Sequence, residues 1–158
     1  MTSRPHIRGA LPWLRSGPMW RVHVDAEPEL DAFLAAHPYT RIDLDGACMV
    51  SRAAAHEVLA QAFGFPDSYG GNWDAFHDCW YGFANEHEGG LVAVVWHGLD
   101  IAGATAPATA AEVGWALMEC ADGHWPTPGP PPPTTMRLDL FVLGGGDDFD
   151  RPDTRARA

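Results

Sequence analysis

The feature that most constrains the fold is an uninterrupted apolar run, LVAVVW, at residues 91–96. A strand with one solvent-exposed face alternates apolar and polar residues. A strand of a parallel sheet that is covered on both faces instead has a continuous apolar sequence. Parallel neighbours are joined by long crossovers that usually contain a helix. The run therefore predicts an α/β fold built around a buried parallel sheet.

Other segments predict the partners of this strand. RIDL at residues 41–44 alternates and ends at an Asp-Gly turn, RLDLFVL at 137–143 is a further apolar run, and WRVHV at 20–24 could form an edge strand. The fold class is thus a small parallel sheet of three core strands, with a possible extra N-terminal edge strand, packed with helices and joined by right-handed crossovers. Helices are predicted at residues 27–36, 51–63, 72 to about 82, and 108–121.

The chain of 158 residues suits a single domain with some chain left over. We place that domain at residues 19–143. Residues 1–18 are rich in Arg, Pro and Gly and predict a flexible arm. PTPGPPPPTT at residues 126–135 predicts a stiff, extended insertion, and the Gly-rich, charged residues 144–158 predict a disordered tail.

The cysteines and the N-terminus predict a reducing, cytoplasmic setting. The three cysteines, Cys48, Cys79 and Cys120, cannot all pair. The N-terminal residues lack the apolar central run of a secretory signal. The longest apolar run is too short to span a bilayer, so no membrane partner is expected.

The charge is concentrated in the middle of the chain. The net charge is −11, the sequence has no lysine, and residues 40–122 hold twelve Asp and Glu against Arg41 and Arg52, a balance of −10. Such a surface repels phosphate backbones, so direct nucleic-acid binding is not expected, whereas a basic protein would be attracted. The alternative is that the acidity only keeps the protein soluble.

Residues 65–83, FPDSYGGNWDAFHDCWYGF, carry the most informative pattern. Asn72 is a favourable N-cap, and the preceding glycines allow the chain to turn into a helix. On a helical wheel, one sector collects aromatic residues at spacings of three, four and three, namely Trp73, Phe76, Trp80 and Phe83. The opposite sector collects Asp74, His77, Asp78 and Tyr81. The pattern predicts a helix within residues 71–82 that is aromatic on its buried side and acidic on its exposed side.

The two acidic residues of this helix contribute little to the stability of the fold. Asp74 lies in the first turn, where the helix dipole favours an anion, but Asp78 lies one turn further along the same face. A like-charge pair at this spacing costs roughly 0.2–0.5 kcal/mol. No basic residue occurs between Arg52 and Arg137 to relieve it. A cationic partner, in contrast, would gain from the pair.

The run YGGNWDAFHDC at residues 69–79, followed by Gly82-Phe83 and then by the apolar strand, resembles the signature of the barstar family. Members of this family are intracellular protein inhibitors of secreted guanyl-specific ribonucleases. The resemblance spans about residues 41–143 and is strongest over 65–96. It implies a barstar-like fold and a basic secreted ribonuclease, or a related toxin, as the partner.

The resemblance also implies a site. The family inserts this helix and the preceding loop into the nuclease active site, where acids stand in for RNA phosphates. Asp78 would be the central anion, Asp74 a second one, and Glu119 a peripheral one from the next long helix. Ser68 and His77 replace aromatic or large apolar contact residues of the family. The predicted partner-binding residues are Ser68, Gly71, Asn72, Asp74, His77, Asp78, Tyr81, Gly82, Phe83 and Glu119.

Other functions remain open at this point. The same helix could confer immunity to a toxin that is not a ribonuclease. A small hydrolase could use His77 with a neighbouring Asp, but no complete triad or oxyanion donor set is visible. A metal site would need more ligands than an Asp-His pair three residues apart provides. We therefore expect no enzymatic activity, no catalytic residue, no metal or cofactor, and a monomer.

Overall fold

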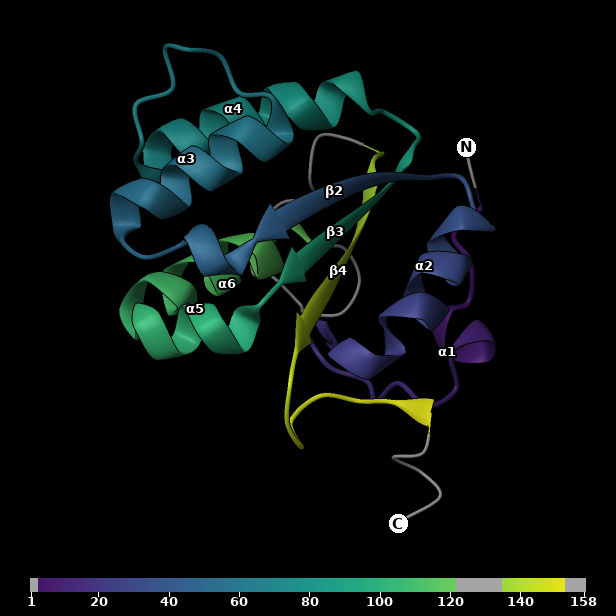
Figure 1. Ribbon diagram of the computed structural model, residues 1–158. Helices are drawn as coiled ribbons and strands as arrows, with labels where there is room; N and C mark the ends of the chain where they lie inside the picture. The colour runs from purple at the N-terminus through teal and green to yellow at the C-terminus, as the bar shows by residue number, and fades with distance from the viewer. Residues whose placement is uncertain (1–2, 122–134, 153–158) are drawn as a thin grey trace.

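The apolar run forms one of the two inner strands of a four-stranded parallel sheet with helices on both faces (Figure 1). This computed structural model describes residues 3–121 and 135–152. The strands are β1 (Trp20–His23), β2 (Tyr39–Asp45), β3 (Leu91–His97) and β4 (Arg137–Gly144), in the order β1-β4-β3-β2. All three pairings are parallel. The predicted α/β class is confirmed, and the optional N-terminal strand is present at the edge beside β4.

Strand β3 is buried on both sides because its alternate residues enter two different cores. Val92, Val94 and Trp96 belong to one hydrophobic cluster. Ala93 and Val95 belong to the other. Each of these side chains is 0% exposed. The continuous apolar run therefore reflects two covered faces, as the sequence pattern indicates.

The helices divide between the two faces of the sheet. Figure 1 shows α3, α4, α5 and α6 on one side and α1 and α2 on the other. Their bounds are α1 Ile7–Ala10, α2 Glu27–Ala35, α3 Arg52–Phe63, α4 Trp73–Glu86, α5 Leu99–Thr105 and α6 Pro107–Cys120, with short 3₁₀ turns at Val24–Ala26 and Gly46–Cys48. None of the helices described is long and apolar enough to cross a membrane.

The extent of α4 and the presence of α5 differ from the sequence prediction. Helix α4 continues past Gly82 to Glu86, because Phe83 and Ala84 are buried and extend the core-facing stripe by another turn. Helix α5 was not predicted, since its seven residues, LDIAGAT, are too few for a clear period. In contrast, α3 begins and ends as expected. The Ser51 hydroxyl accepts a hydrogen bond from the Ala54 N–H at 3.1 Å, and Gly64 closes the helix at φ 67°.

The prediction of a flexible arm at residues 1–18 is wrong for the part that packs on the sheet. Ile7, Leu11, Trp13 and Leu14 are 7% exposed or less. They share a cluster with residues of α2 and the second face of the sheet. The short helix α2 cannot cover this face alone, so the N-terminal segment completes the layer.

Two buried carboxylates, one in β4 and one in the segment that follows it, form ion pairs with the N-terminal segment. Asp139 of β4 is 0% exposed and forms an ion pair with Arg4. It also accepts a hydrogen bond from the Tyr39 hydroxyl at 2.7 Å. Asp150 is 1% exposed and forms an ion pair with Arg15 at 2.6 Å. Buried carboxylates need such partners because their desolvation is costly.

The prediction of a disordered tail from residue 144 is also wrong as far as residue 152. Asp150 adds to the edge of the sheet: its N–H donates to the Arg21 carbonyl at 2.9 Å, and its carbonyl accepts from the His23 N–H at 2.7 Å. Phe149 is buried against Gly144, where a side chain would collide with its ring. Residues 153–158 lie outside the described part of the chain, as does the Pro-rich insertion apart from its last residue.

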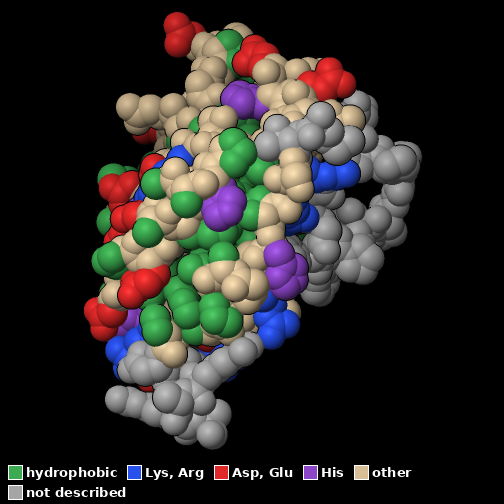
Figure 2. Space-filling view, turned by 90° about the vertical axis from the view of Figure 1, so that its right-hand side faces the viewer, with side chains coloured by type: hydrophobic (Ala, Val, Ile, Leu, Met, Phe, Trp, Pro, Cys, Tyr) green, Lys and Arg blue, Asp and Glu red, His purple; other side chains and the backbone are tan. Residues whose placement is uncertain are grey.

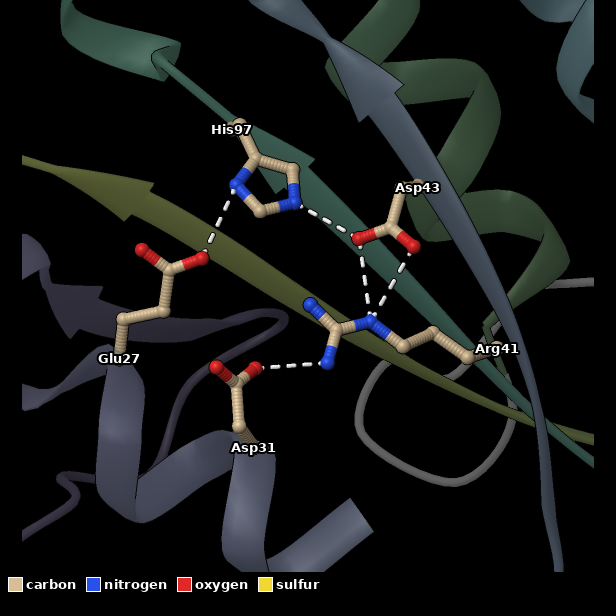
Figure 3. A network of polar contacts seen from close by, with 5 residues as sticks. All are labelled: Glu27, Asp31, Arg41, Asp43 and His97. Atoms are coloured by element: carbon tan, nitrogen blue, oxygen red, sulfur yellow. Dashed lines mark hydrogen bonds and ion pairs between the residues drawn. The ribbon is translucent and has the colours of Figure 1, made fainter. Parts of the chain in front are cut away.

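A charged network joins α2 to the exposed edge of the sheet (Figure 3). Arg41 of β2 contacts Asp31 of α2 at 2.6 Å and Asp43 of β2 at 3.0 Å. His97, at the end of β3, lies between Asp43 and Glu27 at 2.7 and 3.5 Å. Figure 2 looks onto the side that carries α1 and α2 and shows acidic side chains along one edge of this face. Charges on an edge strand also oppose pairing with a second sheet.

Tyr39 should make the stability of the protein sensitive to alkaline pH. Burial and then the charge of Asp139 raise the pKa of its hydroxyl well above the ordinary value of 10.0. Its contribution to stability is therefore complete below pH 10 and is lost as the pH rises above that value, because only the unfolded chain releases the proton readily.

We expect the free energy of unfolding, measured with urea between pH 8 and 11, to fall less steeply in Tyr39→Phe than in the native protein. Tyr69, whose pKa burial raises to about 12, remains in both proteins and acts as an internal control. Equal slopes in the two proteins would contradict the assignment.

Candidate partner-binding surface

Helix α4 begins as the sequence predicts. The Asn72 side chain accepts a hydrogen bond from the Ala75 N–H at 2.8 Å. Gly71, just before it, has φ 66°, a conformation that favours glycine. Asp74 lies in the first turn, where the partial positive charge of the helix N-terminus stabilises an anion. These local features set the direction in which α4 leaves the loop.

Replacing the cap residue should destabilise the domain modestly. We expect Asn72→Ala to lower the free energy of unfolding by about 0.5–2 kcal/mol, because one N–H of the first turn loses its acceptor. Urea unfolding would measure the change. Asn85→Ala, an exposed position near the other end of α4, is a matched control that should change stability much less.

The aromatic side of α4 is packed against α3. Phe76, Trp80 and Phe83 are 8% exposed or less, while Trp73 is half-buried. The Phe63 ring of α3 meets Trp80 and Phe83 edge-on, with centroid distances of 5.7 and 5.1 Å. Such edge-to-face packing stabilises the helix in one rotation about its axis. The predicted buried stripe is confirmed.

The opposite side of α4 is open to solvent. Asp74, His77, Asp78 and Tyr81 are all exposed. Within the described residues, neither Asp74 nor Asp78 forms an ion pair. Arg52, the arginine nearest to α4 in sequence, instead binds Glu112 of α6 at 2.6 Å. Two carboxylates one turn apart therefore face water without a counter-charge from the described chain.

The loop before α4 and the first turn of the helix are held by neighbouring helices. The Tyr69 hydroxyl is 2.5 Å from Nδ1 of the buried His56 on α3, whose pKa is lowered by burial. The Trp73 indole N–H donates to Glu112 at 3.2 Å. Hydrogen bonds from Arg52 and Trp73 lower the pKa of the Glu112 carboxyl. These contacts position the exposed acids before any partner arrives.

A comparison with known families identifies the family of the chain. A family model described as Barstar (barnase inhibitor) matches residues 39–135. The chain belongs to the barstar family. At the level of the family it is therefore a ribonuclease inhibitor. No significant match was found among curated proteins. The matched region runs from the first residue of β2 through α4 and α6, so the barstar-family match leaves out α1, β1 and α2 before it and β4 after it.

The structure separates the predicted barstar-type contact residues into two groups. Phe83 is 7% exposed and packs in the aromatic stripe, so its side chain offers little surface to a partner. The others are exposed: Ser68, Gly71, Asn72, Asp74, His77, Asp78, Tyr81, Gly82 and Glu119. Their role in binding stays a prediction.

Helix α6 brings Glu119 to the same side of the molecule as α4. A groove of about 500 Å³ between the two helices is lined by Trp73, His77, Ala111, Glu112, Trp115, Ala116 and Glu119. Trp115, which is 58% exposed, is not among the residues predicted from the sequence. The sequence does contain an indication of this exposure, because Trp115 falls outside the apolar stripe that Val113, Ala116 and Leu117 form on α6.

Catalysis and metal binding were the other interpretations of the His77 segment. No hydrogen bond links His77 to Asp74 or Asp78 among them, although a hydrolase would need such a pair. The same part of the chain contains no cluster of three or more His, Cys, Asp or Glu residues arranged to hold a metal. Cys48, Cys79 and Cys120 are free thiols, and burial raises the pKa of Cys120.

Proposed function

We propose that this protein inhibits a basic secreted ribonuclease of the guanyl-specific type by inserting α4 and the preceding loop into its active site. The observation that carries the proposal is the pair of exposed carboxylates, Asp74 and Asp78, which lack a counter-charge within the described chain. Nuclease active sites bind phosphates through cationic side chains. Two carboxylates on a rigid helix offer such a site anions that are already positioned. Unlike RNA, they contain no phosphodiester bond that the enzyme could cleave.

The charge of the chain favours fast association with such an enzyme. The net charge of −11 would attract a basic partner and raise the association rate at low ionic strength. We further propose that the protein acts as a cytoplasmic monomer that forms a one-to-one complex. In this function it blocks an enzyme and has no turnover of its own, in keeping with an inhibitor family.

The test is titration of secreted guanyl-specific ribonucleases with the native protein, with cleavage of an RNA substrate as the readout. We expect activity to fall linearly to zero at one equivalent. Affinity and association rate should both decrease as salt is raised from about 0.05 to 0.5 M. The absence of inhibition across the panel at low salt would overturn the proposal.

A parallel capture experiment separates the alternative function. Proteins retained by the native inhibitor are assayed for cleavage of RNA and of DNA. A captured ribonuclease supports the proposal. A captured toxin that does not cleave RNA would instead support immunity through the same helix.

A further inference from the structure

Trp115 of α6 is an unusually exposed aromatic residue for its position. It is 58% exposed, more than any other large hydrophobic side chain in the described residues. It lines the groove between α4 and α6, which His77 of α4 also lines. An exposed tryptophan contributes little to the core, whereas tryptophan is strongly enriched among the residues that dominate protein–protein binding.

Glu119 holds the Trp115 indole in a fixed orientation. The indole N–H donates to Oε1 of Glu119 at 2.9 Å, one helical turn further along α6. This bond occupies only one carboxylate oxygen of Glu119, so the second oxygen remains an acceptor. The pair therefore presents an aromatic face and an anionic oxygen side by side, with the orientation set before binding.

The charge of the groove rests on Glu119. The other acid in the lining, Glu112, is already engaged by Arg52 through two hydrogen bonds, at 3.1 and 2.6 Å, and by Trp73 at 3.2 Å. Within the described residues Glu119 has no such cation. An incoming cationic side chain would therefore be attracted to the Trp115 end of the groove.

We propose that Trp115 belongs to the inhibitory surface, where its indole packs against an arginine side chain of the ribonuclease that also binds Glu119, the acid of α6 already expected to contact the partner. This inference rests on the proposed function and names a further contact for it. A planar guanidinium can stack on the indole face and donate to the carboxylate at the same time. The compact ammonium of lysine matches this combination less well.

The proposed Trp115 contact also adds aromatic surface to the mainly charged and polar exposed face of α4. The exposed face of α4 carries two acids, a histidine and one large aromatic side chain, Tyr81. Charged pairs alone give steering and specificity, while aromatic anchors in partly desolvated pockets supply much of the affinity. Trp115 provides such an anchor from the neighbouring helix.

The experiment uses the ribonuclease that the native protein inhibits in the titration above. We expect Trp115→Ala to raise Kd about 30-fold, mainly by faster dissociation. Trp115→Phe should retain part of the affinity. Val24→Ala, which shortens another exposed apolar residue beside α2, is the matched control and should leave Kd unchanged. Melting temperatures of all variants verify that they are folded.

A double-mutant cycle identifies the bound group. Each surface arginine of the ribonuclease is replaced by lysine, and Kd is measured against native and Trp115→Ala inhibitor. One arginine should show coupling, so that its replacement removes most of the Trp115 effect. Trp115→Phe is the second variant for the cycle, so the coupling is also measured if Trp115→Ala folds poorly.

The outcomes distinguish the two proposals. If Asp78→Ala loses inhibition while Trp115→Ala binds as tightly as the native protein, the Trp115 contact is wrong and the proposed function stands. A Trp115 effect that couples to no arginine would overturn the guanidinium assignment. A native protein that inhibits no ribonuclease would overturn both.

Discussion

Asp78→Ala is expected to weaken binding to the target ribonuclease by roughly 2–5 kcal/mol, an increase in Kd of about 30-fold to several thousand-fold. Asp78 is exposed in the free protein, one turn above Asp74 on the outer face of α4. In the complex it would be desolvated against the catalytic cations of the enzyme. Its removal leaves those cations buried without an anion, which is the costly part of truncating one member of such a pair.

The loss should come from the contact and not from a change in folding or total charge. Asp78→Ala removes a like-charge neighbour of Asp74, so the stability of the free protein should stay the same or rise by about 0.2–0.5 kcal/mol. Glu86→Ala removes one negative charge from the exposed last turn of the same helix and is the matched control. Calorimetry or inhibition kinetics gives Kd for each variant.

Equal losses in Asp78→Ala and Glu86→Ala would mean that net charge alone drives association. Native affinity in Asp78→Ala would mean that α4 does not enter the active site. In either case the mode of binding proposed above would have to be replaced.

Removal of residues 1–16 is expected to abolish cooperative folding. These residues include Ile7, Leu11 and Leu14, which are buried in the layer on the second face of the sheet. They also include Arg4 and Arg15, the partners of the buried Asp139 and Asp150. Breaking one buried ion pair from one side costs about 3–5 kcal/mol, and a whole domain is stable by only about 5–15 kcal/mol. Circular dichroism during heating measures the result.

Single substitutions test the same point without deleting chain. Arg4→Ala should lower the free energy of unfolding by about 3–5 kcal/mol, because Asp139 is 0% exposed. Arg8→Ala is the control and should cost little, because among the described residues the Arg8 guanidinium makes one exposed contact, with the Ser16 hydroxyl at 3.2 Å. A truncated protein with the native melting temperature would show that residues 1–16 are dispensable for the fold.

Because of the position of this layer, we expect substitutions in it to lower the stability of the protein without weakening its binding to the ribonuclease. Helices α1 and α2 lie on the face of the sheet opposite to α4 (Figure 1). Arg4→Ala, studied at a temperature where it remains folded, should therefore inhibit the ribonuclease as well as the native protein does.

The sequence by itself determined the features of this protein that depend only on residues close together in the chain. The continuous apolar run at residues 91–96 required a strand covered on both faces, and this became β3. Spacings of three and four residues separated the aromatic and acidic sides of α4, and Asn72 set its start. Each of these features depends on periodicity or on a hydrogen bond between near neighbours, which a single sequence displays directly.

Only the tertiary structure decided where the N-terminal segment, the residues that follow β4 and the second part of the candidate surface lie. Residues 4–14 and 145–150 show no clear period, and they are ordered by the uncovered face and edge of the sheet and by ion pairs between residues 135 positions apart. The groove that joins His77 to Trp115 and Glu119 arises from the packing of α4 beside α6. Such contacts connect segments that are distant in sequence, so their partners become visible only when the sheet brings them together.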